Sequence, residues 1–135
     1  ALQGNGNTRH SIEYFNKSID LDPNNFSAKN NLGNSYKAIG RYDLAESNYS
    51  SALKLKPDYA DAFNNLGICF AELACPDDSI KSYQKAIEIR PDFADAYNNL
   101  GTTLKNIARP EDSIKSYQKA IEIKPDYFEE PALNE

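Results

Sequence analysis

The sequence predicts an all-α solenoid built from antiparallel pairs of helices. The first observation is a spacing of 34 residues that four prolines share: Pro23, Pro57, Pro91 and Pro125. Three glycines keep the same spacing: Gly33, Gly67 and Gly101. A constant spacing of this length indicates one structural unit copied along the chain. Such copies stack into an extended array and do not wrap around a single core.

The copies align without gaps, which indicates internal duplication. Residues 78–89 and residues 112–123 share the sequence Asp-Ser-Ile-Lys-Ser-Tyr-Gln-Lys-Ala-Ile-Glu-Ile. We therefore divide the chain into a partial unit, three full units and a tail: residues 1–25, 26–59, 60–93, 94–127 and 128–135. The partial unit is expected to hold only a second helix, over about residues 8–22, because the residues before it are few and rich in Gly and Asn.

Each unit holds two helical patterns separated by a break. In residues 60–93 the first pattern runs from about residue 59 to residue 73, with Asp58 as the expected N-cap. Pro76 suits the first position of the second helix, and Pro91 ends it. The same order of signals recurs in the other units, so each unit is predicted to be a helix–turn–helix pair.

Small residues mark the turns and the helix contacts. Gly40 is expected to adopt a left-handed conformation after its helix, whereas Ala74 and Ala108 take its place in the later units, so we expect those turns to differ. The three repeated glycines fall inside helices, where glycine costs about 1 kcal/mol. We infer close helix contacts there and expect the facing surfaces to be alanines: Ala45, Ala52, Ala86 and Ala120.

The composition argues against several functions. A formal net charge of −5 and a pI near 4.9 disfavour binding to a nucleic-acid backbone. No apolar run is long enough to span a membrane and no secretory signal is visible, so we expect a cytoplasmic protein. Cys69 and Cys75 are expected to be reduced thiols, and with His10 as the single histidine no metal or cofactor site is predicted.

The residues kept in each unit resemble the tetratricopeptide repeat. In the second unit they are Leu66, Gly67, Phe70, Ser79, Tyr83, Ala86 and Pro91. The resemblance implies a right-handed superhelix in which the first helix of each unit lines a concave groove. Residues at groove-lining positions are then Asn30, Asn31, Asn34, Lys37, Asn64, Asn65, Ile68, Glu72, Asn98, Asn99, Thr102 and Lys105. The related pentatricopeptide proteins bind RNA, which the acidic balance of this chain disfavours.

One asparagine per unit stands directly before Leu-Gly: Asn31, Asn65 and Asn99. A side-chain amide can pair with both polar groups of a peptide unit, so a row of them can hold an extended backbone. The row is similar to the asparagine ladder of O-linked N-acetylglucosamine transferases. The alternative is that these amides solvate the groove or bond within the array.

The groove positions that carry cations in the chaperone-binding relatives point to a different ligand for this chain. Those relatives hold a terminal carboxylate with Lys and Arg, and the matching positions here are Asn30, Asn34, Asn65, Asp95 and Asn99. We therefore expect no clamp of that kind. Asp61 and Asp95 stand near helix starts, where they stabilise the helix dipole; the alternative is an acidic rim for basic ligands.

These patterns predict a non-catalytic scaffold that binds an extended protein segment in its groove. The alternative is the substrate-recruiting arm of a larger enzyme, such as a glycosyltransferase. Catalysis by this chain itself is not expected, because no nucleophile–base set, metal cluster or phosphate loop is visible. The terminal units of a solenoid expose a face that a neighbour would otherwise cover, so we expect end-to-end self-association unless a following domain covers it.

Overall fold

Prolines and left-handed turn residues divide the chain into helices of similar length. The computed structural model describes residues 2–128. These residues form seven α-helices and a closing 3₁₀ helix: α1 (Leu2–Leu21), α2 (Phe26–Ala38), α3 (Tyr42–Leu55), α4 (Ala60–Glu72), α5 (Pro76–Ile89), α6 (Ala94–Asn106), α7 (Pro110–Ile123) and η1 (Pro125–Phe128). Pro76 and Pro110 occupy first-turn positions of α5 and α7, as predicted. None of the described helices is long and apolar enough to cross a membrane.

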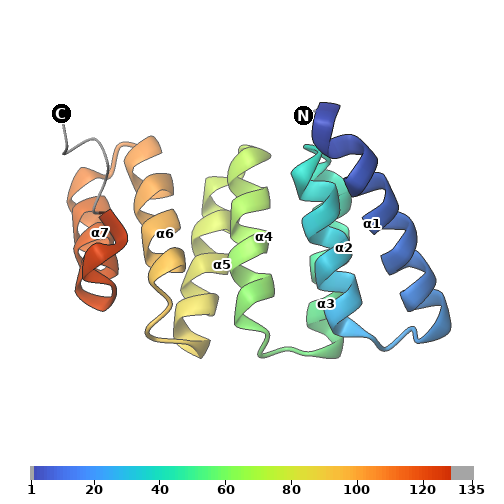
Figure 1. Ribbon diagram of the computed structural model, residues 1–135. Helices are drawn as coiled ribbons and strands as arrows, with labels where there is room; N and C mark the ends of the chain where they lie inside the picture. The colour runs from blue at the N-terminus through green and yellow to red at the C-terminus, as the bar shows by residue number, and fades with distance from the viewer. Residues whose placement is uncertain (1, 129–135) are drawn as a thin grey trace.

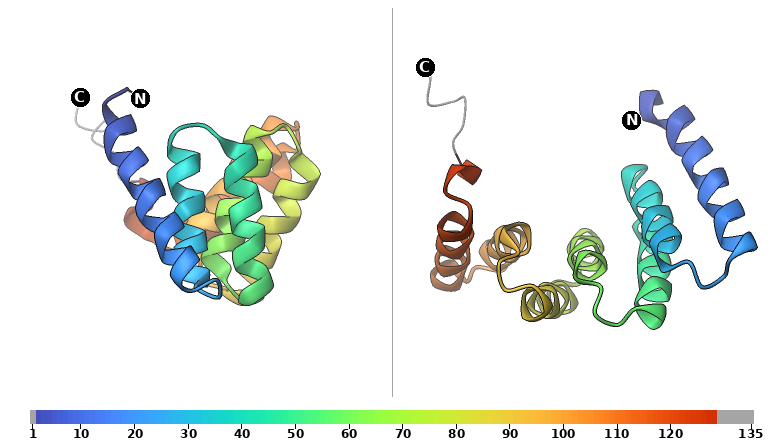
Figure 2. Two further views of the ribbon diagram at one scale, coloured as in Figure 1. Left: turned by 90° about the vertical axis from the view of Figure 1, so that its right-hand side faces the viewer. Right: turned by 60° about the horizontal axis from the view of Figure 1, so that its bottom comes forward.

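The helices form a single row of pairs (Figure 1). Helices α2 and α3, α4 and α5, and α6 and α7 pack as pairs, and α1 packs on α2. The first helices of successive pairs also contact one another, α2 with α4 and α4 with α6, whereas within residues 2–128 no second helix contacts another second helix. The array is therefore curved, with α2, α4 and α6 on its inner side, as the right-hand view of Figure 2 shows.

The turns inside the three units are alike, contrary to the expectation that alanine would change them. Gly40, Ala74 and Ala108 all lie in the left-handed region, with φ of 78°, 60° and 62°. In each case the next residue donates its backbone N–H to a carbonyl five residues earlier, as Arg41 does to Tyr36 and Cys75 to Phe70. The surrounding helix pair holds the two alanines in a conformation that glycine adopts without strain.

The repeated glycines make room for tyrosine rings, not for alanines. A Cβ added at Gly33 would lie 2.6 Å from the Tyr49 ring, and one at Gly67 would lie 2.5 Å from the Tyr83 ring. Gly101 has the same relation to Tyr117, at 2.8 Å. The predicted alanine contacts were therefore wrong in their partner, because a large ring on the second helix fills the space that the missing side chain leaves.

Two helix starts differ from the sequence-based expectation. The N-cap of α4 is Tyr59, and Asp58 instead pairs with Lys56 at 3.0 Å, so Asp58 is not the cap. Helix α1 begins at Leu2 and not near residue 8. Its Gly6 matches Gly40 in the 34-residue register but is not left-handed.

Candidate functional site

All twelve predicted groove residues lie on α2, α4 and α6, the helices of the inner side. Their exposure separates them into layers. Asn30 and Asn64 are buried, at 5% and 8% exposure, whereas Asn31, Asn65 and Asn99 are half-buried beside them. Glu72, Thr102 and Lys105 are exposed. The Asn-Asn dipeptide of each of the first two units therefore places one amide below the inner surface and one at it, whereas Asn98 and Asn99 are both half-buried.

The surface between α2 and α4, which we call the first step, carries a chain of hydrogen bonds. Asn65 Nδ2 donates to Asn30 Oδ1 at 3.4 Å, and Lys37 Nζ donates to Asn65 Oδ1 at 3.3 Å. Beside them, the Tyr49 hydroxyl donates to Asn34 Oδ1 at 2.6 Å. A lysine and a tyrosine from two helices thus fix the orientation of two inner-surface amides.

The surface between α4 and α6, the second step, repeats the asparagine pair alone. Asn99 Nδ2 donates to Asn64 Oδ1 at 3.1 Å. Ile68 and Ala71 occupy the register positions of Asn34 and Lys37. In the described chain no residue donates a hydrogen bond to Asn99 Oδ1, so this amide oxygen differs from that of Asn65.

The alternative for the asparagines was that their amides bond within the array, and two of the three, Asn65 and Asn99, do so. Each pair joins residues 35 positions apart, from the second asparagine of one unit to the first asparagine of the unit before it. An amide nitrogen carries two N–H groups, so Asn65 and Asn99 each keep one after this bond. The internal bond orients the remaining N–H and does not consume it.

Burial sets the charge state of the groups behind the first step. Desolvation lowers the pKa of the Lys37 ammonium, which lies half-buried in the inner surface. Burial also raises the pKa of the Cys69 thiol to about 11, so it is protonated at neutral pH. Cys69 and Cys75 are both free thiols, as predicted.

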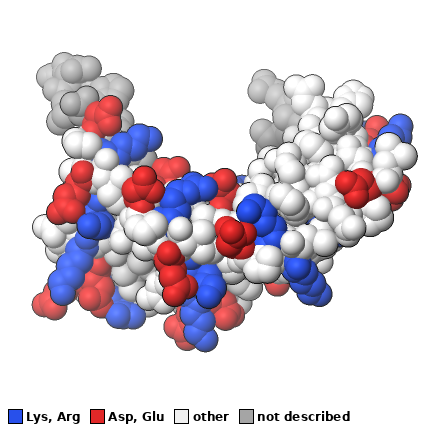
Figure 3. Space-filling model, turned by 90° about the horizontal axis from the view of Figure 1, so that it is seen from below, with Lys and Arg blue, Asp and Glu red and all other residues white. Residues whose placement is uncertain are grey.

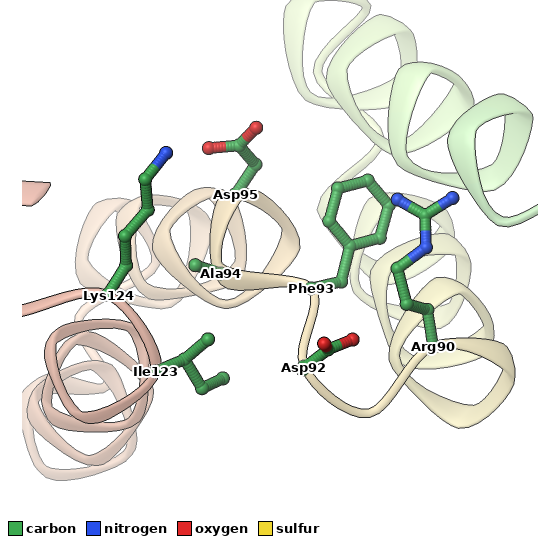
Figure 4. Close-up of a pocket in the computed structure, with 7 residues that line it drawn as sticks. All are labelled: Arg90, Asp92, Phe93, Ala94, Asp95, Ile123 and Lys124. Carbon is green, nitrogen blue, oxygen red and sulfur yellow. The ribbon is translucent and has the colours of Figure 1, made fainter.

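The acidic residues Asp61 and Asp95 are exposed in the first turns of the inner helices α4 and α6. Asp61 pairs with Arg90 at 3.2 Å, and the Arg90 guanidinium lies over the Phe93 ring at 4.3 Å from its centroid. Figure 4 shows the depression that Arg90 and Phe93 line together with Asp95 and Lys124. The pairing with Arg90 offsets the charge of Asp61, which weakens the alternative of an acidic rim.

Positive and negative side chains are interspersed on the face that carries the turns between units. Figure 3 shows Lys and Arg alternating with Asp and Glu over this face. Two of these contacts are Lys56 with Asp58 and Arg90 with Asp61, both exposed. Such pairs add little stability, and a mixed surface gives no cationic field for a nucleic-acid backbone.

Sequence reasoning missed five hydrogen bonds of the inner helices, which are of three kinds. It did not find the buried acceptors Asn30 and Asn64, although the repeated Asn-Asn dipeptide was the available signal. It did not find the bond from Lys37 to Asn65, which joins residues 28 positions apart. It also missed that Ser79 and Ser113 donate to the carbonyls of Gly67 and Gly101, at 2.8 and 2.7 Å.

Comparison with known families matches nearly the whole chain. The family described as TPR repeat matches residues 33–73 and 77–107, and tetratricopeptide repeat families match residues 94–127, 14–47 and 1–25. The chain belongs to the tetratricopeptide repeat (TPR) family. The 34-residue unit and the inner position of the first helices are thereby those of a TPR array.

Solved structures of another TPR protein, MamA, are similar over almost the full chain. A crystal structure of MamA is 28% identical, covers 93% of this chain and 73% of that one, and has a TM-score of 0.84. A second MamA structure is 27% identical over 92% of this chain and 68% of that one, with a TM-score of 0.80. MamA from Desulfovibrio magneticus RS-1 is 22% identical, covers 94% and 72%, and has a TM-score of 0.82, which shows the fold alone. No protein of curated function matches the chain in sequence.

These comparisons confirm the predicted all-α, right-handed solenoid. They also identify the chain as a repeat scaffold for protein–protein interaction, since TPR proteins bind protein partners. The resemblance of the asparagine row to that of O-linked N-acetylglucosamine transferases stays a prediction.

Proposed function

We propose that this TPR array holds an extended segment of a partner protein along the inner surface of α2, α4 and α6. The observation that carries the proposal is the asparagine pair repeated across both steps. Each pair fixes the amide of Asn65 or Asn99 at the inner surface with one N–H still available. Fixed amides lose little rotational freedom when a ligand binds, which favours contacts to a peptide backbone.

The expected affinity is modest. Each hydrogen bond contributes about 0.5–1.5 kcal/mol net, so three asparagines supply a few kcal/mol before the ordering of the peptide is subtracted. We therefore expect dissociation constants in the micromolar range or weaker for a segment held by backbone contacts alone.

A peptide-array screen tests the proposal. The binding of extended peptides to the chain is compared with their binding to the variant in which Asn31, Asn65 and Asn99 are all changed to Ala. We expect binding to fall at least tenfold for peptides of unrelated sequence, because the contacts are to the backbone. Circular dichroism confirms that the variant is folded. Unchanged binding in the triple variant would refute the proposal.

We also propose that the array associates end to end with a second copy of the chain. On α7 the side chains of Ile114 and Ile121 are 53% and 41% exposed, whereas Ile80 and Ile87 at the same register pack against α6. The other end exposes Tyr14 and Leu21 on α1, at 65% and 87%. Light scattering over a concentration series is expected to show growth in mass that Ile114→Lys reduces, and a constant monomer mass at every concentration would refute the association.

A further inference from the structure

The first step has an excess of hydrogen-bond donors. The three amide oxygens that could accept a bond from a ligand are already acceptors within the array. Asn30 Oδ1 accepts from Asn65, Asn65 Oδ1 accepts from Lys37, and Asn34 Oδ1 accepts from Tyr49. Each oxygen already accepts from a donor of the array. Asn65 keeps one amide N–H after its bond to Asn30, and within the described chain Asn34 keeps both, so these N–H groups remain for a ligand.

The ammonium of Lys37 adds donors of its own. It has three N–H groups, and the bond to Asn65 uses one of them. The ion pairs of residues 2–128 do not include Lys37. Glu46 and Glu72 lie close enough to act on the neighbouring Cys69, yet neither is within ion-pair distance of Lys37. Lys37 is therefore a partly desolvated cation without a carboxylate partner in the described chain.

A group that complements this set must be rich in acceptors and negatively charged. A carboxylate fits, since its two oxygens accept several hydrogen bonds and bonds between an ammonium and a carboxylate are charge-assisted. A backbone carbonyl offers one oxygen and no charge, so it would leave part of the donor set unused. The desolvation that lowers the pKa of Lys37 also means that pairing removes little further hydration from the ammonium.

We propose that the first step binds the side-chain carboxylate of an Asp or Glu in the protein segment held by the groove. Lys37 contacts the carboxylate directly, and the Asn34 and Asn65 amides flank it. This inference rests on the proposed function, and it adds a sequence preference to binding that the asparagines alone would leave unselective. The carboxylate is an internal side chain, because the first step lies along the groove and not at a closed end of it.

The second step lacks the same preference. Ala71 and Ile68 stand where the first step has Lys37 and Asn34, so the second step has no cation at the position of Lys37 and one fewer amide. A segment with one acidic residue is thus held in a single register, with the acidic residue beside α2 and α4.

Fluorescence anisotropy with defined peptides tests the proposal. The parent probe is a peptide of alternating Thr and Ala, blocked at both ends and long enough to span α2, α4 and α6. A second probe carries one Asp within the same sequence, and a third carries a free C-terminal carboxylate instead. We expect the Asp peptide to bind about tenfold more tightly than the parent at low salt, and the advantage to shrink as salt screens the charges.

Variants locate the effect. Lys37→Met keeps the apolar stem without the charge, and is expected to remove the advantage of the Asp peptide over the parent. Both peptides are measured on this variant, because the lost bond to Asn65 affects the two peptides alike. Lys54→Met removes a lysine from the outer helix α3 and is the matched control, expected to keep the advantage. Ala71→Lys places a lysine at the second step and is expected to give a peptide with a second Asp a further gain.

The outcomes separate this inference from the function beneath it. If the peptides bind but Asp gives no advantage, or the advantage survives Lys37→Met, the carboxylate site is refuted and the groove stands. If the peptide with the free C-terminal carboxylate gains as much as the Asp peptide, the assignment to a side chain is wrong. If no probe binds at all, the proposed groove fails and the carboxylate site with it.

Discussion

The first and second steps of the inner surface share one backbone geometry and differ in chemistry. Both carry an asparagine pair that joins residues 35 positions apart. Only the first step connects its pair to a lysine, and only there is an adjacent amide held by a tyrosine hydroxyl. The comparison teaches that the repeat fixes where the inner residues stand, while a few unrepeated side chains decide what each step can bind.

The largest expected effect comes from the rings that support both steps. Tyr49 and Tyr83 are fully buried against Gly33 and Gly67, so truncation leaves a large cavity between the helices of a pair. Tyr49→Ala and Tyr83→Ala are each expected to lower the free energy of unfolding by about 3–5 kcal/mol, measured by urea denaturation.

Tyr117→Ala is the control for these two variants. Tyr117 is only half-buried in the last pair, so its loss is expected to cost less. If Tyr117→Ala lowered the free energy of unfolding as much as the other two variants, the deeper burial of Tyr49 and Tyr83 would not account for their support of the two steps.

The buried asparagines are the next test. Asn30→Ala removes the acceptor of Asn65, and Asn64→Ala removes that of Asn99, so each variant leaves a polar group unpaired at the inner surface. We expect each to cost about 1–2 kcal/mol in urea denaturation, with the larger loss at Asn30, where the bond continues to Lys37. Asn98→Ala, at the same register on α6, is the control and is expected to be milder. A loss at Asn98 as large as at Asn30 would contradict the cross-unit bond.

A titrating group behind the first step gives a smaller, pH-dependent effect. Burial raises the pKa of Cys69 from 9.0 to about 11, so the folded protein retains a proton that the unfolded chain loses between these values. The contribution of this retained proton to the free energy of unfolding is complete below pH 9 and is lost as the pH rises to about 11. The register position behind the second step is Thr103, which does not titrate.

Urea denaturation at about pH 8 and about pH 10 measures this contribution. The protein is expected to lose about 1 kcal/mol from Cys69 over this interval. Cys69→Ala lowers stability at both pH values but is expected to have a flatter dependence on pH. An unchanged slope in Cys69→Ala would mean that the thiol remains solvated in the folded state.

The smallest effect concerns the turns that precede the outer helices. Ala74 and Ala108 adopt a left-handed conformation that costs an alanine about 1–2 kcal/mol. Glycine avoids this strain, but it loses more conformational entropy on folding, which offsets part of the gain. Ala74→Gly and Ala108→Gly are each expected to raise the melting temperature, with a gain of about 0.5 kcal/mol. Gly40→Ala is the reciprocal variant, and stabilisation by it would contradict the strain.

The sequence predicted the architecture because proline, glycine and the apolar pattern act locally. Pro76 and Pro110 suit the first turn of a helix, and both lie there in α5 and α7. The 34-residue spacing then places all first helices on one side of the array. The turns at Ala74 and Ala108 were mispredicted because the packing of the helix pair overrides the intrinsic preference of alanine.

The site was predictable only in outline. Register placed Asn31, Asn65 and Asn99 on the inner helices, since one position per unit must recur on one face. The bonds that orient them depend on the reach of long side chains across helices, such as Lys37 to Asn65, and on rings such as Tyr49 that rise from the second helix. Neither distance can be read from spacing along the chain.

The offset of the asparagine pair has a consequence for how such an array changes over generations. The second unit carries both halves of the contact, Asn64 as the acceptor for the unit after it and Asn65 as the donor to the unit before it. The same Asn-Asn dipeptide stands in the other two units. Copying or deleting one whole unit of 34 residues therefore recreates a complete junction between any two neighbours. The chain can lengthen by gene duplication without compensating substitutions at the new junction, and later changes such as a lysine in one copy can then give each junction its own ligand.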